Sequence, residues 1–101
     1  MKLFDHRTDD GSRYFSRLPR PERWDTLYDC VLRLSGAKVI NHVGEDVGRP
    51  WLDFHYCGHR FLICLSEEHL QLYVDDPQCS DVLLYQVGRH FEKLLSRNKK
   101  A

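Results

Sequence analysis

Histidine and cysteine gather around residue 57 at spacings that would suit a metal ion. His55, Cys57 and His59 are separated by one residue each. In an extended strand, alternate side chains project from the same side about 6.6 Å apart, and Cys64 falls on that side of the next predicted strand. Imidazole nitrogens and thiolates are ligands that Zn²⁺ accepts. A zinc site is therefore one hypothesis, although the sequence lacks the Cys-x-x-Cys pair that is typical of structural zinc sites.

The same side chains also raise the question of catalysis. Cys57 with His55 or His59 resembles a thiol and its base, and Asp53 could orient the His55 imidazole. Catalysis needs in addition a pocket, an oxyanion donor and exclusion of water, and a hairpin surface without a long lid predicts none of these. No phosphate-binding loop, nucleophile elbow or dinucleotide fingerprint is present. We predict no enzyme, no catalytic residue and no cofactor.

The elements that must position these residues are strands. Apolar side chains alternate through residues 51–57, 60–66 and 69–75, after a shorter β-branched run over 37–43. Two-residue turns at 57–58, or alternatively at 58–59, and at 67–68 bring the apolar positions opposite one another. The sequence thus predicts a four-stranded antiparallel meander with one apolar face. This face carries Leu52, Phe54, Tyr56, Phe61, Ile63, Leu65, Leu70, Leu72 and Val74.

Helical periodicity flanks these strands. The apolar stripe that begins at Trp24 predicts a helix over 21–35, and Gly36 suits the left-handed position beyond a helix end. A second helix is predicted to begin at Asp76-Pro77, with Ser80 as the competing N-cap, and to end near Ser96. The predicted fold class is α+β, in the order α-β-β-β-β-α. It is a two-layer sandwich with both helices on the apolar face of the sheet.

Residues 1–20 have a different composition from the rest. This stretch has five basic and three acidic residues, and it ends in a proline-rich segment. It is predicted to be a flexible, mildly basic arm, and residues 21–101 are predicted to form a single domain.

The sheet face that neither helix covers in this arrangement is called the open face below. We predict a binding site there, formed by Trp51, Asp53, His55, Arg60 and Tyr73, because aromatic side chains rarely gather on a merely solvated face. Its occupant could be the arm, through Phe4, Tyr14 or Phe15, a second copy of the chain, or another partner. The open face also includes Cys57, Leu62, Cys64, Gln71 and Asp75.

The charge and composition of the chain indicate which classes of binding partner are favoured. Fifteen basic and fifteen acidic residues give a net charge of zero, which favours self-association and argues against nucleic acid. The sequence has neither a signal peptide nor a membrane-spanning run, which predicts a cytoplasmic protein with cysteines as free thiols. A binding domain that forms a homodimer is the predicted function. The alternative is a zinc-binding or single-stranded nucleic-acid-binding module on the same face.

Two motifs in the last half of the chain resemble those of a family of small bacterial α+β proteins. One is the aromatic-x-Tyr-x-Gly hairpin at 54–58, and the other is the Val-x-Asp-Pro-x-Cys helix start at 74–79. The resemblance implies the α-ββββ-α fold. It carries no activity over to these residues, because no function is established for such proteins.

Overall fold

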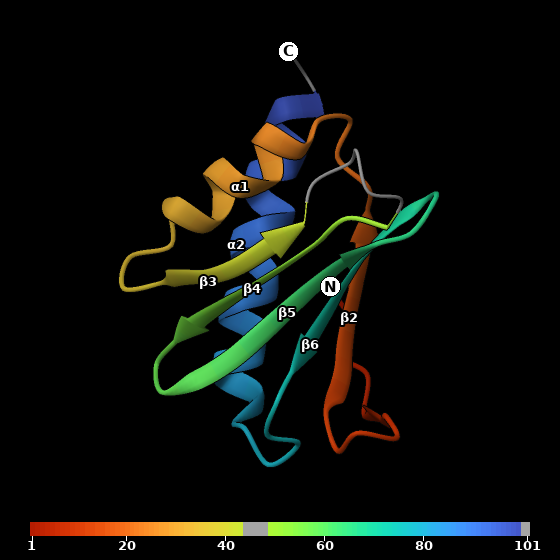
Figure 1. The fold of residues 1–101 in the computed structure, drawn as a ribbon, viewed down its shortest axis with the longest axis vertical. Helices are drawn as coiled ribbons and strands as arrows, with labels where there is room; N and C mark the ends of the chain where they lie inside the picture. Colours follow the sequence, from red (N-terminus) through yellow and green to blue (C-terminus); the bar gives the residue numbers. More distant parts are fainter. Residues whose placement is uncertain (44–48, 100–101) are drawn as a thin grey trace.

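A six-stranded antiparallel sheet and two helices make up the computed structural model, which describes residues 1–43 and 49–99. The sheet forms one layer and the helices lie behind it (Figure 1). Its strand order is β1-β2-β6-β5-β4-β3. The elements are β1 (His6–Arg7), β2 (Arg13–Pro19), α1 (Trp24–Leu32), β3 (Lys38–Val43), β4 (Trp51–Tyr56), β5 (His59–Leu65), β6 (His69–Val74) and α2 (Asp81–Lys99).

The predicted meander is confirmed in both order and register. Strands β3 to β6 follow one another as neighbours, and Phe54 faces Phe61. The first tight turn is Cys57-Gly58, where φ is +51° and +78°. Two positive φ values in succession are those of the hairpin turn that matches the twist of antiparallel strands. The second turn leaves Leu65 opposite Leu70, as predicted.

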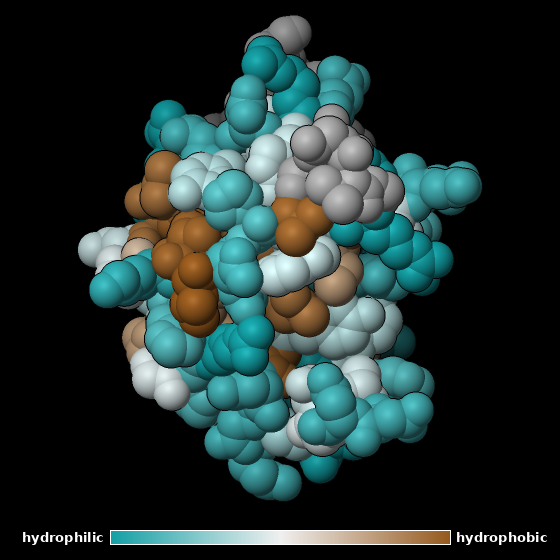
Figure 2. Space-filling model, in the orientation of Figure 1, coloured by the Kyte–Doolittle hydropathy of each residue, from teal (hydrophilic) through white to brown (hydrophobic). Residues whose placement is uncertain are grey.

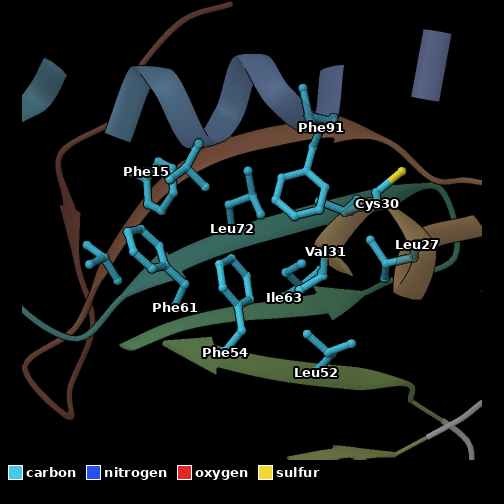
Figure 3. Close-up of a cluster of buried hydrophobic side chains, with 14 of the residues drawn as sticks. Phe15, Leu27, Cys30, Val31, Leu52, Phe54, Phe61, Ile63, Leu72 and Phe91 are labelled. Atoms are coloured by element: carbon cyan, nitrogen blue, oxygen red, sulfur yellow. The ribbon is translucent and has the colours of Figure 1, made fainter. Parts of the chain in front are cut away.

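The core lies between the sheet and the helices. Side chains from α1, such as Val31, and from α2, such as Phe91, lie over Phe54 and Ile63 of the sheet (Figure 3). Both helices therefore cover the predicted apolar face. The buried cluster comprises Phe15, Leu18, Leu27, Cys30, Val31, Leu52, Phe54, Phe61, Ile63, Leu65, Leu70, Leu72, Val74, Cys79, Leu84, Val87, Phe91 and Leu95.

The predicted number of strands was wrong: the sheet has six strands, not four. The two additional strands come from residues 1–20, which were predicted to form a flexible arm. Strand β2 pairs along β6, and β1 pairs with β2. A register shift between Tyr14 and Ser16 turns both Phe15 and Ser16 inward. This bulge breaks the alternation by which a strand is recognised in a sequence.

Both helices differ at their ends from the prediction. Helix α1 is confined to Trp24–Leu32, and α2 begins at Asp81 rather than at Asp76. The competing cap operates there, because the Val82 amide donates to Ser80 Oγ at 3.2 Å. Helix α2 continues to Lys99. In the described ranges, neither helix has the length and apolar character that a membrane crossing requires.

Candidate functional site

The five residues predicted to bind share the open face of the sheet. Trp51, Asp53 and His55 alternate along β4. Arg60 on β5 is directly opposite His55, and Tyr73 on β6 is opposite Leu62. Directly opposed residues point to the same side of a sheet. Since their chain neighbours are buried against the helices, all five lie on the side away from α1 and α2.

The open face combines half-buried apolar side chains with exposed polar ones. Trp51, Leu62 and Tyr73 are half-buried, whereas His55 and Arg60 are exposed. Figure 2 shows hydrophobic surface over β3 and β5 among hydrophilic side chains. Burial raises the pKa of the Tyr73 hydroxyl, so this side chain stays neutral through the physiological range. The face offers aromatic contact area flanked by charge.

An ion pair between an exposed arginine and a buried aspartate lies near the centre of this face. Asp53 is only 1% exposed, and its Oδ2 accepts hydrogen bonds from Arg60 Nε, at 3.0 Å, and from Arg60 Nη2. Asp53 Oδ1 is also buried and has no hydrogen-bond partner among the residues that the structure describes. These two hydrogen bonds fix the orientation of the guanidinium group over the carboxylate, including that of its remaining N–H groups.

Strand β2 adds an aromatic group that the predicted site did not include. Tyr14 is opposite Tyr73, and their rings stack with centroids 5.1 Å apart. Phe4 meets Tyr14 edge-on at 5.5 Å. The N-terminal segment therefore widens the open face at its edge and does not lie across Trp51. Phe15 has the opposite orientation and is fully buried in the core.

The proposed zinc ligands are not gathered into one site. Cys64 is opposite Trp51, at the far end of β4 from His55. Cys57 lies in the turn, and His59 has its Nδ1 3.9 Å from an Asp75 oxygen. Within residues 1–43 and 49–99, no three His, Cys, Asp or Glu side chains are grouped in a way that could hold a metal ion.

A hollow of about 390 Å³ lies beside the β4–β5 turn. It brings together four residues of the open face, namely His55, Cys57, Arg60 and Asp75. Lys38 and Asp75 contribute charges of both signs to its wall. The hollow contains polar groups suited to a salt bridge with a partner.

The four thiols are predicted to differ in their reaction with iodoacetamide at neutral pH. Cys57 is exposed, whereas burial raises the pKa of the Cys30 thiol to about 11 and also raises the pKa values of Cys64 and Cys79. Because the thiolate is the nucleophile, we expect Cys57 to be alkylated first, at least about tenfold faster than Cys30. Peptide mass spectrometry over time measures this order, and denatured protein, in which all four react, is the control. Earlier alkylation of Cys64 would contradict the described burial.

Comparisons of this chain with protein-family models, with curated proteins and with solved structures each give no match.

Proposed function

We propose that this chain is a binding domain that acts through its open face, and that a second copy of the chain is the occupant. The observation that supports this is the cluster of half-buried aromatic and aliphatic side chains at Trp51, Leu62 and Tyr73. These residues lie on the sheet face opposite the helices, and both helices lie behind the sheet in Figure 1. Such clusters are typical of protein interaction sites, where aromatic anchors supply most of the contact area.

The dimensions and charge of the face favour a second copy. The molecule measures 36 by 27 Å across the view in Figure 1, which accommodates the ~800 Å² per partner of a standard interface. Lys38 and Asp75 give the face both signs of charge, so a two-fold contact can pair it with itself. The zero net charge of the whole chain adds no long-range repulsion between copies.

The proposal predicts a dimer that is lost when the aromatic anchors are truncated. We expect Trp51→Ala and Tyr73→Ala each to weaken dimerisation about tenfold or more, because each removes a large contact area at the interface. Analytical ultracentrifugation over a concentration series measures the association. Far-UV circular dichroism of each variant shows whether the fold is intact. Val82→Ala is the matched control, since Val82 is 69% exposed on α2, away from the open face.

Three results would reject this proposal. If the wild-type chain stays monomeric over the whole concentration series, the open face is not a self-association surface. If both alanine variants unfold, these side chains belong to the core. If a monomeric wild type binds a single-stranded oligonucleotide and loses it on Trp51→Ala, the nucleic-acid alternative replaces the dimer.

The proposal also places the domain in the cytoplasm. Its four cysteines lie in the described part of the chain and are free thiols, which a reducing compartment preserves. A domain of this kind would be handled and assayed with reductant present.

A further inference from the structure

A second candidate site lies on the helix side of the sheet, where α1 meets the edge strand β3. It is a hollow of about 540 Å³, called the aromatic hollow below. Three of its lining residues carry rings, two carry carboxylates and one is an exposed leucine. They are Trp24, Tyr28, His42, Asp25, Asp29 and Leu32.

The helical repeat explains why these residues meet. Trp24, Tyr28 and Leu32 are four residues apart on α1 and share one face, and the two aspartates form a parallel row beside them. His42 reaches the same hollow from β3, where it is opposite Leu52 and so points to the helix side. The hollow is therefore separate from the open face.

The three rings form adjoining walls. The Tyr28 and His42 rings are nearly perpendicular, at 77°, with centroids 5.3 Å apart. The Trp24 ring is tilted by 35° to the His42 ring, with centroids 6.3 Å apart. Trp24 and Tyr28 also pack against the core, which fixes their positions. The faces of indole and phenol rings carry negative charge density that attracts cations.

Each of the two carboxylates is paired with an arginine side chain. Asp29 Oδ2 accepts a hydrogen bond from Arg33 Nε at 2.8 Å, and Asp25 Oδ2 accepts one from Arg23 Nη2 at 3.3 Å. All four side chains are largely exposed, so these pairs are weak and their members are free to exchange partners. A positively charged ligand could therefore replace an arginine as the partner of either carboxylate.

We propose that the aromatic hollow binds an alkylated ammonium group, whether as a free small molecule or as a methylated lysine side chain. Such a cation has little or no hydrogen-bonding demand, so ring faces and a nearby carboxylate satisfy it. A metal ion is disfavoured, because the described residues hold no group of three suitable ligands. The aliphatic substituent of the cation would lie along Leu32, which is 59% exposed.

The test is a titration of the full chain with choline, followed by two-dimensional NMR. The indole N–H signal of Trp24 reports on the hollow, and that of Trp51, on the opposite side of the sheet, is the internal reference. We expect the Trp24 signal to shift saturably with choline concentration, with a dissociation constant of about 1 mM. The neutral isostere 3,3-dimethylbutan-1-ol should bind at least about tenfold more weakly.

Variants assign the binding to the hollow. His42→Ala removes a wall at an exposed position, and Asp29→Asn removes rim charge while keeping the side chain's shape. Each is expected to weaken choline binding about threefold to tenfold. Glu92→Gln is the matched control, because Glu92 pairs with Arg89 on α2, outside the hollow. A trimethyllysine peptide that binds more tightly than free trimethyllysine would identify a peptide as the source of the cation, and equal binding would identify a small molecule.

Two results would overturn this inference. Equal affinity for choline and for its neutral isostere would show that charge plays no part. Absence of a saturable Trp24 shift would show that the hollow does not bind this class of ligand. Neither result bears on the open face, whose test is the oligomeric state.

Discussion

Replacing Phe15 with alanine is expected to lower the free energy of unfolding by about 3–5 kcal/mol. The Phe15 ring is fully buried and meets Phe61 edge-on, with centroids 6.0 Å apart. Truncation removes its transfer free energy and leaves a cavity between β2 and the helices. Urea denaturation at pH 7, followed by circular dichroism, measures the change. The result tests whether the N-terminal segment is part of the folded domain.

Phe4→Ala is the matched control for this experiment. Phe4 comes from the same segment but is only half-buried, on the open side of the sheet against Tyr14. Its truncation should cost about 1 kcal/mol, since half the area is buried and no closed cavity forms. If Phe15→Ala were no more costly than Phe4→Ala, β2 would not be anchored in the core as described.

Removing the guanidinium group of Arg60 is the second large effect. In Arg60→Leu, Asp53 keeps a buried carboxylate and loses both N–H donors that contact it. Leaving one member of a buried pair uncompensated costs about 3–5 kcal/mol. Because the Arg60 side chain is 57% exposed, water can partly replace it, and we expect about 2–3 kcal/mol. Urea denaturation measures this value.

A double-mutant cycle separates this pair from general packing effects. Asp53→Asn in the Arg60→Leu background removes the unpaired charge, so the double variant should recover at least about 1 kcal/mol relative to Arg60→Leu alone. Arg7→Leu is the control, because Arg7 pairs with an exposed Asp5 and should change stability by less than about 0.5 kcal/mol. An additive cycle would mean that the contact contributes nothing to stability.

The meander was predictable because its alternation is nearly unbroken. Within each strand every second residue is apolar, from Leu52 to Tyr56, from Phe61 to Leu65 and from Leu70 to Val74. Each two-residue turn keeps these residues on one face of the sheet. Any shift of one residue would expose the entire apolar set, so the pattern fixes the face that each strand buries, while a shift of two residues would keep that face. The residues of the open face followed from the same parity, without further information.

Strand β2 was not predictable from the same pattern. Arg13, Phe15, Ser16 and Leu18 are all buried, and the inward pair at 15–16 comes from a bulge. Arg13 also obscures the strand, because an arginine in a sequence is ordinarily expected to be exposed. Arg13 is accommodated because its guanidinium contacts the Phe4 carbonyl oxygen at 2.8 Å and Asp81 at 3.0 Å. Asp81 is distant from Arg13 in the sequence, and the Phe4 contact is to a backbone oxygen, so neither partner can be recognised from the residues around Arg13.

The chemistry of the open face was predicted only in part. Residue types and parity identified Trp51, Asp53 and Tyr73, but not that Asp53 is buried beneath Arg60, because that depends on how a long side chain lies across the sheet. Tyr14 was named as a side chain through which the N-terminal segment could lie on this face, but its pairing with Tyr73 was not predicted, because that pairing requires β2. The aromatic hollow requires α1 to be placed against β3, which one-dimensional spacing does not reveal.

The pairing of β2 with β6 bears on how the chain folds. Pro19 is paired with His69 and Arg13 with Val74, so these contacts close loops of about 50 to 60 residues. The β4–β5 and β5–β6 hairpins, by contrast, close over two-residue turns. Loop-closure entropy grows with length, and distant pairings form slowly compared with local ones. Until that closure, the meander ends in an unpaired β6 edge, and Phe15 has no place in a core. Among the strand pairings of the described residues, the β2–β6 pairing therefore has the largest loop-closure cost.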